Sequence, residues 1–442
     1  MTLTCIYLTK TLESDKLDQE ITNMERVLIM GVELNTDTTP IENSLDELEE
    51  LVKAAEGTVI ARLTQKMSSI HAAHFIGKGK AEEIKNYCEE LDITTVVFND
   101  ELSGAQLRNL EKMIDKKIVD RTNLILDIFA NRADSKEGKL QVKLAQLKYR
   151  LPRLIGFRDY LSREGGGIGT RGPGEQKLET DRRHILREVD NIEKQLKEVE
   201  QNRSVKRKQR EDSNLPIVAL VGYTNAGKST LLNKIIESND EFDEGKQVFV
   251  KDMLFATLDT SLRRAKLPNG QAFLLTDTVG FVSKLPTKLI AAFKGTLEEV
   301  KYADLLLHVV DASNGDLDIQ IKTTHNILKD LKVLDKPIIT VFNKMDKIDI
   351  PELYYEPEYV ENKIFISAKN SNDVERLLQN IEERLPQQYK YVTLKIPYDK
   401  QSIVNYFMNN YQVDNIEYVE DGTTLKFTIN HIDLQKYSEY II

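Results

Sequence analysis

Cysteine is scarce in this 442-residue chain, which has only Cys5 and Cys88, far apart in the sequence. Neither a disulfide framework nor a cysteine-based zinc site is therefore expected, and a reducing compartment fits the composition. Long apolar runs are also missing, since none approaches the roughly 18 residues of a membrane-spanning helix. The first twenty residues lack a basic stretch followed by an apolar core, so we expect no signal peptide.

Basic residues are in the minority, and the net charge of −10 by itself argues against a nucleic-acid-binding protein. Their distribution is uneven, however. Between Lys139 and Arg210 there are 19 lysines and arginines but only 10 acidic residues, so this segment carries +9 and the rest of the chain −19. Such a basic middle is either a binding surface for a polyanion or a solvated helix face, and charge alone does not decide between them.

Residues 1–135 predict a small α/β domain, because apolar runs such as Arg26–Leu34 and Thr94–Phe98 alternate with helical stretches. Ser44 is followed three residues later by Glu47, which predicts a capping box at the start of a helix that ends near Ala55.

Residues 136–210 predict an antiparallel helical hairpin, because two apolar stripes have helical spacing. The stripes are Leu140, Leu144, Leu147 and Leu151, then Ile185, Val189, Ile192, Leu196 and Val199. Between them, Gly156–Gly174 contains seven glycines. A loop of this length in a compact domain is uncommon unless it is functional or disordered.

Residues 211–385 predict a mostly parallel sheet covered by helices on both faces, because short apolar runs alternate with helix-length segments. The runs are Ile217–Val221, Ala272–Thr276, Leu305–Val310, Ile338–Phe342 and Lys363–Ile366. Residues 386–442 follow the order strand, helix, strand, strand, helix, which predicts a small C-terminal α/β domain.

The segment from Gly222 to Ser229, GYTNAGKS, matches the phosphate-binding loop G-x-x-x-x-G-K-S and lies between a predicted strand and a predicted helix. In this context the backbone N–H groups and the helix N-terminus surround a phosphate. Lys228 would reach the β- and γ-phosphates, and the Ser229 hydroxyl would bind Mg²⁺.

Four further motifs follow in the order that a GTPase requires. Thr257 would bind Mg²⁺ and sense the γ-phosphate, while Asp277 would hold the hydration shell of the metal and the Gly280 N–H would meet the γ-phosphate. Asn343-Lys-Met-Asp346 and Ser367-Ala-Lys369 each follow a strand.

The candidate nucleotide-binding residues are Gly222, Tyr223, Thr224, Asn225, Ala226, Gly227, Lys228, Ser229, Thr230, Phe255, Ala256, Thr257, Asp277, Thr278, Val279, Gly280, Asn343, Lys344, Asp346, Ser367, Ala368 and Lys369. Of these, Lys228, Thr257 and Gly280 are the catalytic candidates, and Ser229 and Thr257 the metal ligands.

Asp346 predicts that the base is guanine. Its carboxylate can accept hydrogen bonds from N1–H and the exocyclic amine of guanine, whereas adenine offers neither donor there. A site built on such bonds rejects the wrong partner by roughly 10⁴–10⁵. Asn343 would brace the loop and contact the base, and Lys344 would lie over its face.

Two positions depart from the Ras-like pattern. Phe281 stands where Ras-like proteins have the glutamine that orients the attacking water, so intrinsic hydrolysis should be slow until a partner completes the site. Asn225 either helps to bind a K⁺ ion in the phosphate loop or only suits a turn.

The glycine-rich loop and the helix after it also carry arginines, which can pair with phosphates and stack on bases. The candidate RNA contacts are Arg158, Arg163, Arg171, Arg182 and Arg183. The alternative is a disordered tip without a partner.

The stretch GGGIGTRGPGEQKLETDRR (residues 165–183), followed by GYTNAGKSTL and DTVGF, closely resembles the HflX family of GTPases, and the resemblance covers nearly the whole chain. It implies binding to the large ribosomal subunit, contacts between the N-terminal region and ribosomal RNA, and a hairpin tip near the peptidyl-transferase region. It also implies splitting of stalled ribosomes under stress, with hydrolysis of GTP stimulated by the ribosome.

The sequence therefore predicts a GTPase, active as a monomer, that binds the large ribosomal subunit and splits or rescues stalled ribosomes. Two alternatives stay open: an assembly factor that uses GTP as a timer, and a signalling GTPase with a protein partner and no RNA. The expected location is the cytoplasm, with peripheral association to ribosomes or membranes left open. The expected cofactors are GTP or GDP and Mg²⁺, with K⁺ as a further candidate.

Overall fold

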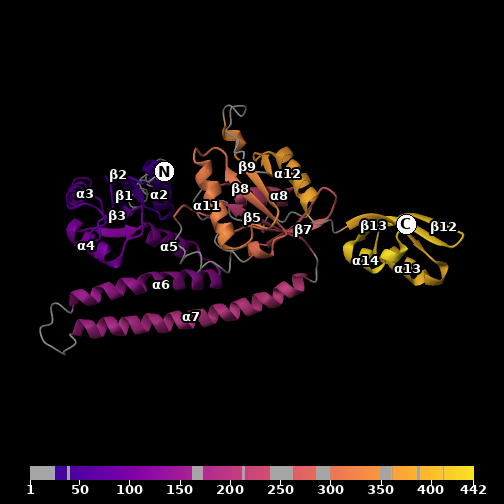
Figure 1. Ribbon diagram of the computed structural model, residues 1–442, viewed down its shortest axis with the longest axis horizontal. Coiled ribbons are helices and arrows are strands. Elements are labelled where there is room, and N and C mark those ends of the chain that lie inside the picture. The colour runs from indigo at the N-terminus through magenta and orange to yellow at the C-terminus, as the bar shows by residue number, and fades with distance from the viewer. Residues whose placement is uncertain are drawn as a thin grey trace, which may run out of the picture.

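The computed structural model describes residues 25–36, 40–161, 173–211, 215–238, 262–284, 299–348, 360, 362–385, 389–411 and 413–442. Three β-sheets, the helices that pack on them and a long helical hairpin account for most of these residues (Figure 1). Within them, no helix combines the length and the hydropathy needed to cross a lipid bilayer.

The first sheet is parallel throughout, with the strand order β2-β1-β3-β4. Alternate residues of β1 point into two different cores, Ile29 on one face and Leu28 on the other. A parallel strand that is buried on both faces needs the nearly continuous apolar run that Arg26–Leu34 provides. The strands are β1 Arg26–Leu34, β2 Thr58–Met67, β3 Thr95–Phe98 and β4 Lys117–Asp120, and the helices are α2 Ile41–Ala54, α3 Lys78–Glu90, α4 Gly104–Ile114 and α5 Arg121–Arg132.

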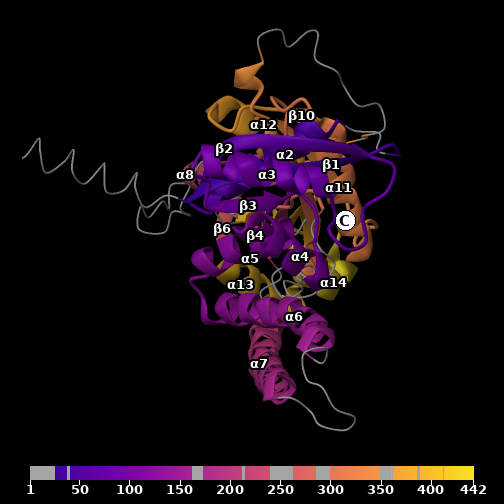
Figure 2. The ribbon, with the colours of Figure 1, turned by 90° about the vertical axis from the view of Figure 1, so that its left-hand side faces the viewer.

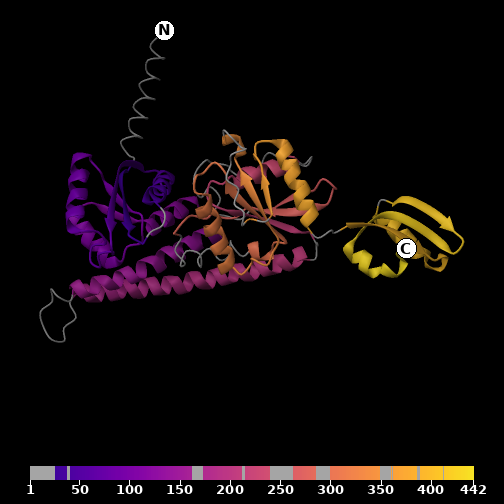
Figure 3. The same cartoon turned by 45° about the horizontal axis from the view of Figure 1, so that its top comes forward.

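The expected hairpin consists of α6 Lys136–Leu161 and α7 Pro173–Glu211. The predicted apolar stripes meet between the two helices, where Leu144, Leu147, Ile185, Val189 and Ile192 form one buried cluster. Lys143 and Lys148 of α6 reinforce this seam through ion pairs with Glu188 and Glu193 of α7. At 39 residues, α7 is about 58 Å long. It runs below both the first sheet and the six-stranded second sheet, which begins with β5 at Ile217 (Figure 3).

A buried carboxylate at the end of β4 fixes the hairpin to the N-terminal sheet. Asp120 is fully buried and accepts hydrogen bonds from the Tyr149 hydroxyl (2.6 Å) and the Arg153 guanidinium (3.0 Å), both on α6. The Arg153 guanidinium also stacks on the Tyr149 ring, 3.3 Å from its centroid. Burial, followed by the charge of Asp120, raises the pKa of Tyr149 far above its usual range, so this hydroxyl remains a donor. The hairpin lies on the side of α4 and α5 (Figure 2).

The second sheet has the order β10-β9-β8-β5-β7-β6, and only its edge strand β6 is antiparallel. Side chains of β5 alternate between a core shared with α8 and α12, which contains Leu220, and a core shared with α11, which contains Val221. The expected apolar runs all form strands, while β6 was not expected from the sequence. The elements are β5 Ile217–Gly222, α8 Lys228–Glu237, β6 Leu262–Lys266, β7 Ala272–Thr276, β8 Leu305–Asp311, α11 Leu317–Asp330, β9 Ile338–Asn343, β10 Lys363–Phe365 and α12 Ser371–Arg384.

The third sheet is antiparallel, with the order β11-β13-β12, and helices cover one of its faces. Its elements are β11 Tyr389–Ile396, α13 Gln401–Asn410, β12 Val413–Val419, β13 Gly422–Asn430 and α14 His431–Lys436. The last helix was expected at Leu434–Tyr440; α14 instead begins three residues earlier and ends at Lys436, and a 3₁₀ turn at Ser438–Tyr440 follows it.

The predicted capping box at Ser44 and Glu47 is wrong. Helix α2 begins one turn earlier, at Ile41, directly after Pro40, and no side chain caps it. Pro40 has the extended backbone of a residue that precedes a helix, and its missing N–H costs no helical hydrogen bond there. Ser44 and Glu47 therefore lie inside the helix, and their side chains are available for contacts with other elements.

Candidate nucleotide site

The loop between β5 and α8 has the backbone shape of a phosphate-binding loop. Gly222 and Gly227 have φ values of 144° and 92°, which side chains rarely permit. A Cβ on Gly222 would lie 2.1 Å from the carbonyl oxygen of Val309, and one on Gly227 would lie 2.3 Å from Nδ2 of Asn343. Asn225 also has a positive φ, 59°, a conformation that asparagine tolerates. The turn thus accounts for Asn225, and its role in K⁺ binding remains a prediction.

Lys228, the first residue of α8, is held under this loop. Its ammonium donates hydrogen bonds to the carbonyl oxygens of Gly222 (3.1 Å) and Tyr223 (2.7 Å). Burial lowers the pKa of Lys228 to about 8, against the opposing effect of the Asp277 carboxylate. A buried cation that is only partly neutralised by carbonyl dipoles is well suited to an incoming phosphate.

The Ser229 hydroxyl and the Asp277 carboxylate face each other at the other side of the loop, 2.6 Å apart. Asp277 follows β7, is fully buried, and accepts a second hydrogen bond from the Thr278 N–H. The Thr278 hydroxyl donates to Leu220 of β5, which fixes the end of β7 beside the loop. A hydroxyl and one carboxylate, with phosphate oxygens, form the hard oxygen environment that Mg²⁺ prefers. These residues therefore fit the metal that the sequence predicts.

The segment after Asp277 is paired with the phosphate loop. The Thr224 N–H donates to the Phe281 carbonyl (2.8 Å), and the Phe281 N–H donates to the Gly222 carbonyl (3.1 Å). The Phe281 side chain is 2% exposed and belongs to the core shared with α11. It cannot orient a water molecule, as the sequence predicted. Val279 points away from the nucleotide site, into the core of the N-terminal sheet.

The expected base-binding residues meet at the ends of β9 and β10. The Asn343 side chain donates to the Ala226 carbonyl and accepts from the Ala368 N–H, each at 2.9 Å, and so joins three loops. The Ser367 hydroxyl donates to Asp346 (2.8 Å), and this bond is the main reason that the pKa of Asp346 is lowered. Asp346 is thus a charged acceptor at the expected edge of the base.

Two lysines near the base site form ion pairs, one with Asp311 and one with Asp346. The Lys344 ammonium pairs with Asp311 at the end of β8 (2.7 Å). Lys369 is 73% exposed and lies 3.5 Å from Asp346.

The structure thus brings together the phosphate loop, the Asp277–Gly280 segment, and the residues at the ends of β9 and β10. Phe255, Ala256 and Thr257 lie outside the described residues, as do Arg163 and Arg171. Arg158 lies on α6, and its side chain is not among those described. Arg182 and Arg183 lie on α7, 45% and 65% exposed, and both pair with Glu179.

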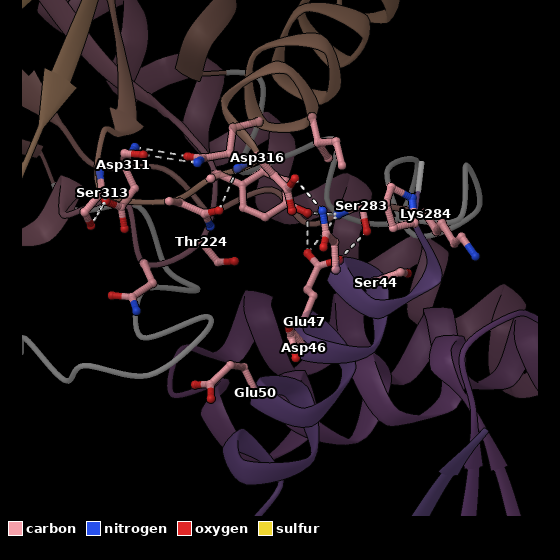
Figure 4. A pocket seen from close by; sticks show the side chains of 18 of the residues that line it. Ser44, Asp46, Glu47, Glu50, Thr224, Ser283, Lys284, Asp311, Ser313 and Asp316 are labelled. Carbon is pink, nitrogen blue, oxygen red and sulfur yellow. Dashed lines mark hydrogen bonds between the residues drawn. The ribbon is translucent and has the colours of Figure 1, made fainter. Parts of the chain in front are cut away.

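Sequence reasoning missed a polar cluster that lies beside this site and connects it to α2. Glu47 of α2 accepts hydrogen bonds from the Tyr223 hydroxyl, the Ser283 hydroxyl and the Arg121 guanidinium. The cluster borders a cavity of about 670 Å³ between α2, the phosphate loop and the turn before α11 (Figure 4). The sequence held no local signal for this contact, because Glu47 satisfied a capping pattern equally well.

Four family models match the chain in succession. They are described as "GTP-binding GTPase N-terminal" (residues 42–130), "GTP-binding GTPase Middle Region" (132–210), "50S ribosome-binding GTPase" (217–344) and "HflX C-terminal domain" (353–436).

Curated relatives match over most of their length. The GTPase HflX of Caldanaerobacter subterraneus subsp. tengcongensis is 46% identical over 437 residues, which span 99% of this chain and 98% of the relative. The GTPase HflX of Escherichia coli (strain K12) is 39% identical over 86% of this chain and 88% of the relative. Among solved structures, a GTP-binding protein from Sulfolobus solfataricus in complex with GDP is 25% identical over 81% of this chain and 98% of that chain, with a TM-score of 0.42. From its relatives and its family models, this chain belongs to the HflX family and is a GTPase.

Proposed function

We propose that this GTPase binds the large ribosomal subunit in its GTP-bound state and splits or rescues stalled ribosomes, and that the ribosome stimulates hydrolysis. The main observation in support of the proposal is the hairpin. Its two long helices are attached to the N-terminal sheet through the hydrogen bonds that α6 donates to Asp120. The ends of the two helices that face the glycine-rich segment lie at the far end of the molecule from the third sheet (Figure 1). The description "50S ribosome-binding GTPase" of the matching family supports the choice of partner.

The charge of the hairpin suits ribosomal RNA. The segment from Lys139 to Arg210 carries a net charge of +9 in a chain of net charge −10. Arg182 and Arg183 are exposed on α7, near the glycine-rich segment, where they can exchange Glu179 for phosphates. Exposed ion pairs of this kind are worth only about 0–1 kcal/mol, so that exchange costs little.

In the proposed reaction, Lys228 and the N–H groups of the phosphate loop hold the phosphates, and Asp346 selects guanine. Ser229 and Thr257 would hold Mg²⁺, and Asp277 its hydration shell; when bound, the metal neutralises charge on the phosphates. Phe281 is buried and has no polar atom in its side chain, so it offers the attacking water no hydrogen-bond partner. Ribosomal contacts would therefore complete the site, which makes hydrolysis conditional on binding.

A light-scattering experiment with intact ribosomes tests splitting. Addition of the protein with a non-hydrolysable GTP analogue should lower the scattered light as subunits separate, and addition with GDP should not. A variant with Gly165, Gly166 and Gly167 replaced by alanine should keep basal hydrolysis and lose splitting. If the wild-type protein binds large subunits but leaves intact ribosomes whole, the proposed splitting is wrong, and a GTP-timed assembly factor becomes the better account.

A further inference from the structure

We propose that Glu47, on helix α2 of the N-terminal domain, is a positioning residue that makes the nucleotide site favour GDP over GTP. It does so by holding the segment after Gly280 against the phosphate loop. The inference rests on guanine-nucleotide binding by the family and does not depend on the ribosomal role.

One carboxylate joins the phosphate loop to the segment that follows Gly280. Glu47 accepts from the hydroxyl of Tyr223, which lies in the phosphate loop, and from the hydroxyl of Ser283, three residues after Gly280. The Ser283 N–H is also 3.2 Å from Glu47 and 2.5 Å from the Tyr223 hydroxyl. Arg121 completes the cluster: its guanidinium donates to Glu47, to the Ser283 carbonyl (3.2 Å) and to the Ser283 hydroxyl (3.0 Å).

The cluster is sheltered, so its hydrogen bonds are strong. The side chain of Arg121 is 2% exposed and that of Glu47 is 13% exposed. Asn99 accepts from the other end of the guanidinium (2.9 Å) and donates to Ser44 of α2 (2.8 Å), which fixes Arg121 in place. Charge-assisted hydrogen bonds in such surroundings are stronger than exposed ones.

Apolar side chains of the segment after Asp277 also hold it against α2. Val279 and Val282 belong to the core cluster that also contains Leu45 and Leu48 of α2. The segment from Val279 to Ser283 is therefore clamped between α2 and the phosphate loop, with Phe281 paired to the loop through its backbone.

In this clamped position Gly280 lies so close to the phosphate loop that not even a methyl group would fit comfortably beside the Lys228 ammonium. A Cβ on Gly280 would lie 2.7 Å from Cγ2 of Thr224 and 3.1 Å from the ammonium nitrogen of Lys228. The γ-phosphate of GTP must fit between that ammonium and the Gly280 N–H. Gly280 therefore has to move away when GTP binds, whereas GDP leaves this space empty and requires no movement.

The movement of Gly280 must either break the bonds of Ser283 to Glu47 or displace α2. The intact cluster thus stabilises the arrangement that accepts GDP, and the cost of opening it is subtracted from the affinity for GTP. By linkage, a partner that pulls α2 away from the segment raises the affinity for GTP by the same factor.

Calorimetry with GDP and with a non-hydrolysable GTP analogue, both with Mg²⁺, tests the inference in the full-length Glu47→Gln variant. The ratio of the GDP Kd to the analogue Kd should rise by roughly 5- to 20-fold relative to the wild type, within the usual range of coupling between sites. Glu49→Gln is the matched control, because Glu49 lies on the same helix and pairs with Arg62 and Lys53, neither of which belongs to the cluster. Its ratio should equal that of the wild type.

Two further variants separate positioning from folding. Glu47→Gln combined with Arg121→Met removes both buried charges and should give the same raised ratio. Ser283→Ala removes one hydroxyl and should give an intermediate ratio. An unchanged or lowered ratio in Glu47→Gln and Ser283→Ala, or an equal loss of affinity for both nucleotides, would overturn the inference. Failure to split ribosomes would leave it intact.

Discussion

Replacing Gly227 by alanine should damage nucleotide binding by a calculable amount. The new side chain would have φ 92° and its Cβ would lie 2.3 Å from Nδ2 of Asn343. A left-handed conformation costs an L-residue about 1–2 kcal/mol. The clash also displaces Asn343, whose two buried hydrogen bonds join Ala226 and Ala368, at about 1 kcal/mol each. We expect the ligand-free loop of the variant to relax out of this shape, so that GDP binding must restore it; the sum of about 3 kcal/mol then corresponds to a loss of roughly two powers of ten in the GDP Kd.

Calorimetric titration with GDP measures this loss, and Gly270→Ala provides its control. Gly270 also has a positive φ, 82°, but a Cβ there would meet nothing within 4 Å, and the residue lies in the β6–β7 turn. This control should lower stability slightly and leave the GDP Kd unchanged. If Gly227→Ala bound GDP within about threefold of the wild type, well below the change that 3 kcal/mol implies, the described role of Asn343 and the loop would be refuted.

Three other predictions concern the same domain. Asp346→Asn should move preference from GTP toward xanthosine triphosphate in competition binding; unchanged GTP affinity would show that Asp346 does not contact the base. Lys228→Ala should abolish measurable binding of a GTP analogue in equilibrium dialysis, and retained binding would contradict the role of the ammonium. Burial, with smaller effects of Lys228 and His325, lowers the pKa of His308 to about 3. In the unfolded chain His308 binds a proton as the pH falls below about 6.5, whereas in the folded protein it stays neutral down to a much lower pH. The free energy of unfolding should therefore decrease by about 2 kcal/mol between pH 7 and pH 5 because of this residue. Urea titrations at both pH values should therefore show a smaller decline for His308→Asn, and an equal decline would count against it.

Elements with a strong local pattern could be predicted from the sequence. The run Arg26–Leu34 forms β1 with the same bounds, because a strand buried on both faces must be apolar throughout. The hairpin seam was predictable for a similar reason, since its leucines and isoleucines are spaced for helices that pack only on one another. The phosphate loop followed from glycines whose backbone angles other residues rarely adopt.

Contacts between distant segments could not be predicted. Glu47 and Ser283 are 236 positions apart, and neither has a neighbour that reveals the other. The pattern at Ser44 and Glu47 favoured a helix cap, but Pro40 starts the helix earlier and turns Glu47 toward the phosphate loop. The edge strand β6 was missed because Leu262–Lys266 includes three charged residues and lacks an apolar run. Tertiary pairing with β7, rather than local propensity, makes it a strand.

Hydrolysis of GTP with and without purified large ribosomal subunits tests the central claim most directly. Phe281 is buried and cannot position a water molecule, so the isolated protein should turn over slowly and large subunits should raise its rate by at least about tenfold. That stimulation should decline steeply as salt is added, because basic side chains of the hairpin must displace ions from RNA phosphates. A rate that large subunits leave unchanged, under conditions where the protein binds GTP, would contradict a ribosome-dependent GTPase.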